Sequence, residues 1–315
     1  MDAFDVITMG RVGVDLYPLQ VGVGLEDVTT FGTFLGGSAT NVAVAAARHG
    51  RRAAVITRTG ADPFGRFIHR ALGELGVDDR FVTAVAGLPT PVTFCEIFPP
   101  DSFPLYFYRE PVAPDLVIEP DELDLAAIGA ARVFWATVTG LSREPSRAAH
   151  HAAWAARGRT PLTVLDLDYR PMFWAGEDAA RTEVRRALGS VTVAVGNLDE
   201  CAVATGERDP HRAADALLDA GVELAVVKQG PNGVLGRSRT ETVQVAPARV
   251  EVLNGLGAGD GFGGALCHGL LAGWPLDRVL RFANAAGAIV ASRLECSTAM
   301  PTTAEVDGFL EVSHA

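Results

Sequence analysis

The strongest constraint on the fold is a repeated alternation between short apolar runs and longer segments in which apolar residues recur at helical spacing. The apolar runs predict strands at residues 5–9, 52–57, 132–136, 162–167, 192–196 and 224–228. The other segments predict helices at residues 41–49, 64–75, 146–157, 179–188, 210–220 and 261–272. Such alternation predicts an α/β fold with a mostly parallel central sheet flanked by helices. Ligands of such sheets bind beyond the carboxyl ends of the strands, so a site is expected in the loops there.

Two segments interrupt this alternation. Residues 13–35 and 89–114 lack long helical periodicity, and the second contains the alternating runs 92–98 and 105–108. This pattern predicts strands that leave the main sheet. The expected organisation is therefore an α/β domain of residues 1–12, 36–88 and 115–315, with residues 13–35 and 89–114 forming a small β-sheet lid.

Composition narrows the function classes. Apolar residues make up 48% of the 315 residues and charged residues 21%, as in ordinary globular proteins. The net charge of −11 argues against nucleic acid or an anionic membrane as a partner. No uncharged apolar run is long enough to span a bilayer, and the start, MDAFDVITMG, is acidic, unlike a signal peptide. The four cysteines are scattered, so neither zinc nor disulfides are indicated, and a cytoplasmic location is expected.

A glycine-rich stretch, NGLGAGDGFGG at residues 254–264, holds six glycines and one acid, Asp260. Residues 249–253 before it alternate like a strand, and residues after it have helical character. One interpretation is that Asp260 caps the helix, but a cap needs a single residue and leaves the glycines unexplained. A second is dinucleotide binding, since residues 259–264 satisfy G-x-G-x-x-G. That fingerprint opens an early βαβ unit and needs an acid after the next strand, whereas a helical segment follows here.

The third interpretation, phosphoryl transfer, explains both the glycines and the acid. Backbone N–H groups of Gly257, Ala258 and Gly259 at a helix start would hold charge on a transferring phosphoryl group. Asp260 would accept the proton of an attacking hydroxyl. Lys228 is the single lysine among 27 basic residues and no Gly-Lys-Ser/Thr occurs, so a P-loop is excluded.

These residues resemble the signatures of ribokinase-like (PfkB-type) carbohydrate kinases. Residues 257–260 (GAGD) are similar to the second signature of that family, and residues 35–43 (LGGSATNVA) are similar to the first. Residues 197–200 (NLDE) resemble its N-x-x-E motif, and residues 228–233 (KQGPNG) resemble its K-x-G-x-x-G turn. The four motifs occur in family order.

The resemblance implies a ribokinase-like fold, a β lid over the sugar, and Asp260 as the catalytic base beside Gly257, Ala258 and Gly259. Sugar hydroxyls would be bound by Asp15, Gly36, Gly37 and Asn41. Two structural roles stay open as alternatives, a helix N-cap for Asn41 and a tight turn for the glycine pair.

The same resemblance implies ATP and Mg²⁺ as cofactors. The residues implied at the nucleotide are Asn197, Lys228, Gly230, Gly233 and Asn284, with Glu200 holding Mg²⁺ through water. The alternative for Asn284 is a polar residue on a buried helix.

One stretch departs from the family pattern. Many members carry Asp-Thr ahead of the GAGD run, where these residues help to bind a monovalent cation. This chain has Asn254, Gly255 and Leu256, which lack the carboxylate and hydroxyl oxygens that K⁺ prefers. Potassium activation is therefore not expected from these side chains, although backbone carbonyls could contribute.

Three arginines bear on the substrate. Arg11 precedes Asp15, Arg109 lies in the expected lid, and Arg170 follows a central strand. Guanidinium groups bind carboxylates as a planar fork, so this set favours a sugar acid over a neutral sugar. The alternatives are structural ion pairs, of Arg109 with Glu110 and of Arg170 with Asp166 or Asp168, or contact of Arg170 with nucleotide phosphates.

The expected reaction is phosphorylation of the terminal hydroxyl of a keto-deoxy sugar acid. The resemblance points to 5-dehydro-2-deoxy-D-gluconate of inositol catabolism, with 2-keto-3-deoxygluconate as the alternative. A nucleoside kinase stays open because lid aromatics could stack on a base, as does a sugar-binding regulator that would not need Asp260. If the chain forms a homodimer, the exposed face of the lid is the expected contact.

Overall fold

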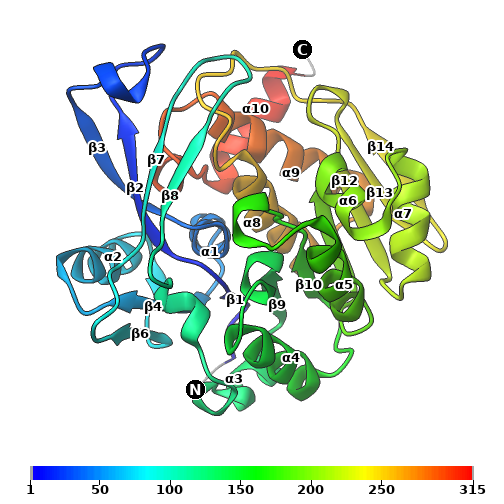
Figure 1. Cartoon of the computed structure of the whole chain (residues 1–315). Helices are drawn as coiled ribbons and strands as arrows, with labels where there is room; N and C mark the ends of the chain where they lie inside the picture. Colours follow the sequence, from blue (N-terminus) through cyan, green and yellow to red (C-terminus); the bar gives the residue numbers. More distant parts are fainter. Residues whose placement is uncertain (1–2, 314–315) are drawn as a thin grey trace.

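The computed structural model describes residues 3–313 of the chain. Its main sheet has ten strands, and nine of them follow the order β14-β13-β12-β11-β10-β9-β1-β4-β5, with β6 paired to β4 (Figure 1). The parallel strands are β1 (Val6–Met9), β4 (Ala53–Gly60), β5 (Val77–Asp78), β6 (Val82–Val85), β9 (Val133–Thr137), β10 (Thr163–Asp166), β11 (Val193–Asn197) and β12 (Leu224–Lys228). The antiparallel edge is formed by β13 (Val234–Ser238) and β14 (Thr242–Val245).

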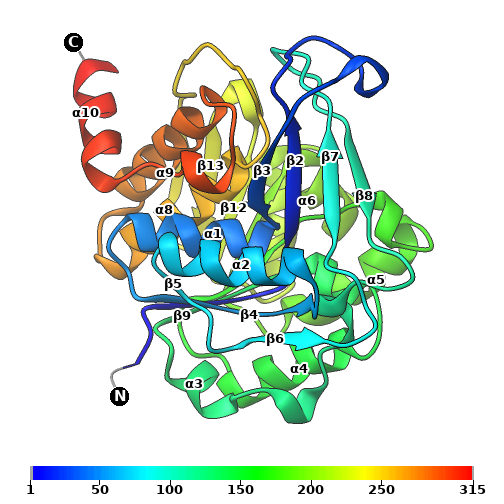
Figure 2. The same ribbon diagram turned by 90° about the vertical axis from the view of Figure 1, so that its left-hand side faces the viewer.

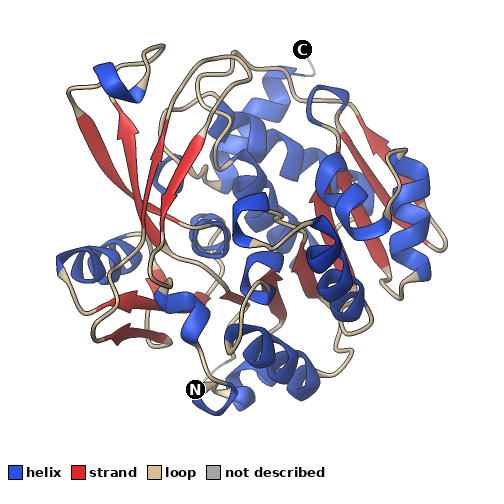
Figure 3. Ribbon diagram, viewed as in Figure 1, coloured by secondary structure: helices blue, strands red, loops and turns tan. Residues whose placement is uncertain are grey.

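Helices cover both faces of this sheet, as Figure 3 shows. One core packs the sheet against α1 (Ser38–Arg48), α2 (Pro63–Glu74), α8 (Ala258–Leu271), α9 (Leu276–Ala291) and α10 (Thr303–Ser313). The other packs it against α3 (Leu125–Ala130), α4 (Ser146–Arg157), α5 (Glu177–Leu188), α6 (Leu198–Thr205) and α7 (Pro210–Asp219). Alternate residues of one strand enter opposite cores, as Val133 and Phe134 do in β9, because successive side chains point to opposite faces. Strands buried on both faces need continuous apolar runs, and this requirement explains why the sequence predicts them well.

A second sheet of four strands has the order β3-β2-β7-β8. Its strands are β2 (Gly13–Pro18), β3 (Phe31–Gly36), β7 (Val92–Cys95) and β8 (Leu105–Tyr108). They fall in the two segments expected to leave the main sheet, except that β3 ends at Gly36. Figure 2 shows these strands projecting from the α/β layers, near the start of α1.

The structure corrects the sequence prediction in one place that bears on the site. Residues 249–253, all within the described chain, form no strand. Leu253 N–H and Asn254 N–H both donate to the carbonyl of Ala291, the last residue of α9, so this stretch is held by a helix end and not by a sheet. The glycine-rich loop therefore joins an extended segment, not a strand, to α8.

Two glycines of α8 allow that helix to lie close to its neighbours. A Cβ on Gly263 would lie 2.8 Å from the Trp135 ring, and a Cβ on Gly264 would overlap Ala45 of α1. The second half of the glycine-rich stretch thus serves packing of α8 against α1 and β9, as α1 and α8 are in direct contact. Within residues 3–313, no helix combines the length and the hydropathy that crossing a membrane requires.

Candidate active site

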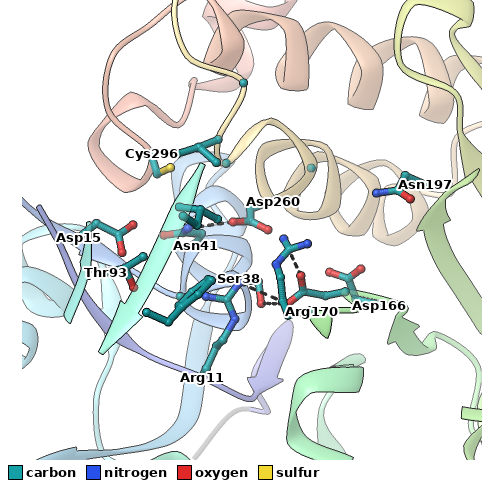
Figure 4. A pocket seen from close by; sticks show the side chains of 18 of the residues that line it. Arg11, Asp15, Ser38, Asn41, Thr93, Asp166, Arg170, Asn197, Asp260 and Cys296 are labelled. Carbon is teal, nitrogen blue, oxygen red and sulfur yellow. Dashed lines mark hydrogen bonds and ion pairs between the residues drawn. The ribbon is translucent and has the colours of Figure 1, made fainter. Parts of the chain in front are cut away.

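A polar cavity of about 220 Å³ lies between the small sheet and the carboxyl ends of the main strands (Figure 4). Asp166 ends β10, Asn197 ends β11 and Lys228 ends β12, so three neighbouring strands deliver polar side chains to one place. The small sheet and the starts of α1 and α8 close the other sides. The polar residues that line the cavity include Arg11, Asp15, Ser38, Asn41, Thr93, Asp166, Asp168, Arg170, Asn197, Glu200, Lys228 and Asp260.

A second cavity, of about 870 Å³, adjoins the first and shares Asn197, Lys228, Gly255 and Gly259 with it. Its walls come from the turn at Gly230 and Gly233, the extended segment 247–252, and helices α8 and α9. Asn284 lines this cavity, and its side-chain amide donates to the carbonyl of Ala246 at 2.9 Å. This second cavity brings together the residues that the resemblance implies for a nucleotide.

The start of α8 offers free backbone donors where the cavities meet. Gly257 is the N-cap with φ of +79°, a left-handed conformation that favours glycine, and a Cβ there would lie 2.6 Å from Cys296 Sγ. Among residues 3–313, no group accepts the N–H of Gly257 or of Gly259, while Ala258 N–H has only a 3.4 Å contact with the carbonyl of Gly255. Unsatisfied N–H groups at a helix start favour an anion.

Asp260 lies in the first turn of α8 and faces the first cavity. Burial raises the pKa of Asp260 to about 6, against a hydrogen bond from Asn41 that lowers it. Asn41 lies in the first turn of α1, whose N-cap is Gly37, so the alternative role of Asn41 as an N-cap is wrong. Its amide nitrogen instead donates to Asp260 Oδ2 at 2.8 Å, and within the described chain its oxygen has no hydrogen-bond partner.

Gly36 and Gly37 form the turn between β3 and α1. A Cβ on Gly36 would overlap the carboxylate of Asp15, and a Cβ on Gly37 would overlap the carbonyl of Arg11. Gly37 also has φ of +104°. The two glycines therefore let β2 and the segment between β1 and β2 approach the start of α1 closely.

Asp15 lies in β2 and is 8% exposed. Burial raises the pKa of Asp15 to about 6, and nearby Asp260 raises it further, against a hydrogen bond from Tyr17, the charge of Arg11 and a hydrogen bond from Thr93. Two carboxylates with raised pKa values thus face one cavity, one from the small sheet and one from the main domain.

Asp168 organises the two arginines of the cavity. Its carboxylate accepts from Ser38 Oγ at 2.6 Å and pairs with Arg170 at 2.8 Å and with Arg11 at 3.3 Å. Burial acts to raise the pKa of Asp168, but both guanidinium groups and the Ser38 hydroxyl outweigh it and hold the pKa well below the usual range. Within residues 3–313, the Nε atoms of Arg11 and Arg170 are buried without a partner. Both arginines therefore keep hydrogen-bonding capacity beyond the pair with Asp168.

Arg109 does not join this cavity. Its guanidinium binds both carboxylate oxygens of Asp115, at 2.8 and 2.9 Å, and lies 5.0 Å from the ring centroid of Phe173. The structure therefore corrects the expectation that Arg109 contacts the substrate. It also corrects the alternative pairing with Glu110, because the turn after β8 brings Asp115 to the arginine instead.

Lys228, Asn197 and Glu200 lie where the two cavities meet. Glu200 Oε2 accepts the N–H of Asn197, and Asn197 Oδ1 accepts the N–H of Glu200, which forms a capping box for α6. Burial acts to lower the pKa of Lys228, but the carboxylates of Glu200, Asp166, Asp260 and Asp168 outweigh it and raise the pKa, so the lysine stays charged.

No three His, Cys, Asp or Glu side chains within the described residues are arranged to hold a metal ion alone. Mg²⁺ is commonly held by one or two carboxylates together with water and substrate phosphates. Glu200 Oε1 is 3.8 Å from Arg170 and accepts no hydrogen bond from residues 3–313, so Glu200 fits contact with such an ion through water.

Asn254 fixes the loop ahead of α8. Its side chain is fully buried, donates from Nδ2 to the carbonyl of Leu294 at 2.7 Å, and accepts the N–H of Leu256 at 3.0 Å. Both ends of the amide are therefore occupied within the protein, and the loop that carries Gly257 is tied to the segment after α9.

The family comparison agrees with this geometry. The sequence pattern of the pfkB family of carbohydrate kinases matches residues 3–303. The chain belongs to this family. It is therefore a carbohydrate kinase, an enzyme that transfers a phosphoryl group to a sugar hydroxyl, and the ribokinase-like α/β fold expected from the motifs is confirmed.

Two relatives of this pfkB kinase are named 5-dehydro-2-deoxygluconokinase. The one from Shouchella clausii is 32% identical over 316 residues, which cover 99% of this chain and 97% of the relative. The one from Photobacterium profundum is 34% identical over 315 residues, with 98% and 95% covered. A solved double mutant of fructokinase from Vibrio cholerae O395, with fructose, ADP and potassium bound, is 25% identical, has a TM-score of 0.83, and is matched over 98% of this chain and 99% of that chain.

The four motifs of the pfkB kinase meet around the two cavities, but no pattern in the sequence marks some of the other lining residues. Thr93 and Cys296 come from segments far from any motif, and each reaches the cavity through the packing of the small sheet. Asp166 and Asp168 could have been found, since acids at the carboxyl end of a central strand point to a ligand site.

Proposed function

We propose that this carbohydrate kinase is an ATP-dependent 5-dehydro-2-deoxygluconokinase, which phosphorylates the terminal hydroxyl of 5-dehydro-2-deoxy-D-gluconate. The observation that carries the proposal is the cavity in which Asp260, free backbone N–H groups and two arginines converge. The names of the full-length relatives support the same sugar acid.

Asp260 would act as the general base. It would take the proton of the terminal hydroxyl, whose oxygen then forms the new bond to phosphorus. The N–H groups of Gly257 and Gly259 and the ammonium of Lys228 would stabilise negative charge on the transferred phosphoryl group. Asp15 and Asn41 would bind other hydroxyls of the sugar.

Arg11 and Arg170 would bind the carboxylate of the sugar acid. Both line the first cavity, and both have a buried Nε without a partner among residues 3–313. A guanidinium supplies a fork of donors that fits a carboxylate, while a neutral sugar would leave these donors without an anion. Arg170 also lies near Glu200, so contact with phosphate is a second role open to it.

The second cavity would hold ATP, with Asn284 and the turn at Gly230 and Gly233 around the nucleoside. Mg²⁺, when bound, would neutralise phosphate charge and polarise the transferred group. Asn197 and Glu200 would face that ion through water. An ATP-dependent reaction and four buried free cysteines fit the cytoplasmic location expected from the sequence.

We also propose that the kinase does not require potassium. The bridge between the loop ahead of α8 and the segment after α9 is made by the Asn254 amide, which needs no ion. A solved double mutant of the fructokinase from Vibrio cholerae O395 contains potassium, which makes the response to potassium the property to compare.

The small sheet would serve as a lid over the sugar, because it carries Asp15 and Thr93 to the cavity from outside the main domain. Its outer face exposes apolar side chains, among them Tyr106 and Tyr108, which are 44% and 65% exposed. A second copy of the chain is the expected partner for that face.

A coupled assay of ADP formation across a panel of sugars tests the proposed function. The panel contains 5-dehydro-2-deoxygluconate, 2-keto-3-deoxygluconate, ribose, fructose and adenosine. The highest kcat/KM is expected with 5-dehydro-2-deoxygluconate. Preference for a neutral sugar or a nucleoside would overturn the substrate, and ADP formation that does not depend on any sugar would overturn the proposal as a whole.

A further inference from the structure

Two buried side chains in the wall of the first cavity, Tyr17 and Cys296, form a hydrogen-bond chain to Asp15. Tyr17 is two residues after Asp15 in β2, so both side chains point to the same face of the small sheet. The Tyr17 hydroxyl lies 3.0 Å from Asp15 Oδ2 and 2.7 Å from Cys296 Sγ. Tyr17 is 1% exposed and Cys296 2% exposed, so water does not compete with these contacts.

The protons of the hydrogen bonds that join Cys296, Tyr17 and Asp15 have one arrangement. Burial raises the pKa of the Tyr17 hydroxyl and of the Cys296 thiol well above their usual values, so both groups keep their protons. A carboxylate can only accept. The single hydroxyl proton of Tyr17 therefore goes to Asp15, and the thiol of Cys296 donates to the Tyr17 oxygen.

Cys296 also connects this series of hydrogen bonds to the start of α8. It packs against the α-carbon of Gly257, so closely that a Cβ there would approach its sulfur to 2.6 Å. The same small cluster of side chains, made of Tyr17, Cys95, Ile97 and Cys296, fills the space beneath the small sheet. Asp15 is thereby held relative to the backbone donors of Gly257 and not only relative to its own strand.

We propose that Tyr17 and Cys296 are positioning residues of the kinase, which hold Asp15 as an oriented, ionised acceptor for a sugar hydroxyl. The inference rests on the proposed function, because it takes Asp15 to bind the sugar. Neither residue belongs to a motif, and neither is expected to touch the reacting atoms.

The charges around Asp15 show why a donor is needed there. Burial and Asp260 of α8 both raise the pKa of Asp15, while the Tyr17 hydroxyl of β2, Arg11 of the connection from β1, and Thr93 of β7 lower it. Cys95 of β7 and Cys296, after α9, are neutral thiols on the same side. Loss of the Tyr17 hydroxyl would move the pKa of Asp15 to higher pH, and a neutral Asp15 would no longer accept from the sugar with its full charge.

The variant Y17F tests the inference, with KM for the sugar and kcat measured from about pH 6 to about pH 9 in the full-length chain. At pH near 7 we expect KM to rise roughly tenfold, the scale of one hydrogen bond to a charged group, while kcat stays within about twofold. KM of Y17F should return toward the wild-type value as the pH rises, because Asp15 then ionises without help.

The matched control is Y106F. Tyr106 also lies on the small sheet and donates to a carboxylate, Glu96 Oε2 at 2.9 Å, but it does not line the cavity. KM of Y106F should equal the wild-type value at each pH. A second pair of variants, C296S and C296A, tests the hydrogen bond from Cys296 to Tyr17. C296S keeps a donor, so its KM for the sugar should lie closer to the wild-type value than the KM of C296A.

Two results would overturn the inference: an unchanged KM in Y17F, or a KM raised by the same factor at all pH values, which would indicate a packing role only. Thermal unfolding of each variant shows whether it is folded, and if Y17F is not, the C296S and C296A pair carries the test. The assays use whichever sugar of the panel the wild type phosphorylates best. Rejection of 5-dehydro-2-deoxygluconate by the wild type would thus defeat the proposed substrate, while a normal Y17F would defeat only this inference.

Discussion

Asn41 Nδ2 donates to Asp260 Oδ2 at 2.8 Å, which joins the first turns of α1 and α8 across the polar cavity. The two residues are 219 positions apart in the chain, and they belong to the two family signatures. The hydrogen bond orients the Asp260 carboxylate and favours its ionised form. The proposed base and one proposed sugar ligand are therefore a single structural unit.

Replacement of Asp260 by Asn is expected to lower kcat by about 10² to 10⁴, the usual contribution of a positioned general base. The side chains have the same shape, and an Asn oxygen can still accept from Asn41, so the fold should be retained. Turnover at saturating sugar and ATP is the measurement, and thermal unfolding is the control. Near-normal turnover in D260N would show that another group removes the proton.

The pH dependence of kcat should report Asp260. Burial raises the pKa of Asp260 to about 6, and a base acts only when deprotonated, so kcat should fall as the pH drops through about 6. In N41A the hydrogen bond that lowers this pKa is lost, and the acid limb should move to higher pH. A limb that stays in place or moves to lower pH in N41A would contradict the assignment.

Replacement of Arg11 by Gln should lower kcat/KM for the sugar acid by roughly tenfold to a hundredfold, the scale of hydrogen bonds to a charged group. Arg11 also pairs with Asp168, but Asp168 keeps Arg170 and Ser38 as partners, so its carboxylate is not left unpaired. The loss should be smaller for a neutral sugar of the panel. An equal loss for both kinds of sugar would argue against contact with the carboxylate.

Replacement of Arg109 by Gln should instead lower stability. Arg109 is paired with Asp115, and the exposed fractions of their side chains are 9% and 1%, so removal of the arginine leaves a buried carboxylate without its cation. We expect the free energy of unfolding to fall by about 3–5 kcal/mol. Urea unfolding measures this, with R109Q/D115N as the control that removes both charges and should recover part of the loss. An unchanged unfolding curve with a raised KM would restore Arg109 as a substrate ligand.

Wild-type activity is expected to be the same in sodium, potassium or tetramethylammonium chloride at equal ionic strength. In N254D the donor to the Leu294 carbonyl is lost, and a carboxylate faces that carbonyl oxygen. Two oxygens without a proton between them repel each other and are the type of ligand a hard cation prefers. N254D should therefore be less active in sodium, with partial recovery in potassium. Strong potassium activation of the wild type would contradict the proposed role of Asn254.

The sequence predicts the six central strands of the main sheet but not β5, β6, β13 and β14 at its two ends. The central strands are continuous apolar runs buried on both faces, so their positions follow from hydropathy alone. By contrast, α8 begins at Ala258 and not at residue 261, because contacts with α1 and α9 hold glycines that have low intrinsic helix propensity. Residues 249–253 alternate like a strand but meet no strand edge, which no local pattern can reveal.

The four motifs predicted much of the site, and Arg11, Asp15 and Arg170 were predicted outside these motifs and line the first cavity. Asp260, Asn41 and Lys228 lie within motifs, and the structure brings them to one place. The pairing of Arg109 with Asp115 depends on the path of the chain after β8. The contact between Tyr17 and Cys296 joins residues 279 positions apart, and only the tertiary fold can bring such residues together.

Lys228 has a practical consequence for chemical labelling. The chain contains one lysine, and its ε-amine lies where the two cavities meet, beside Gly259 and close to four carboxylates. Acylation needs the neutral amine, and the neighbouring carboxylates raise the pKa of Lys228, so the labelling is done at alkaline pH, where Lys228 is the single side-chain amine available. Protection of this amine, followed by mass spectrometry, would report occupancy of the junction directly, without any background from surface lysines.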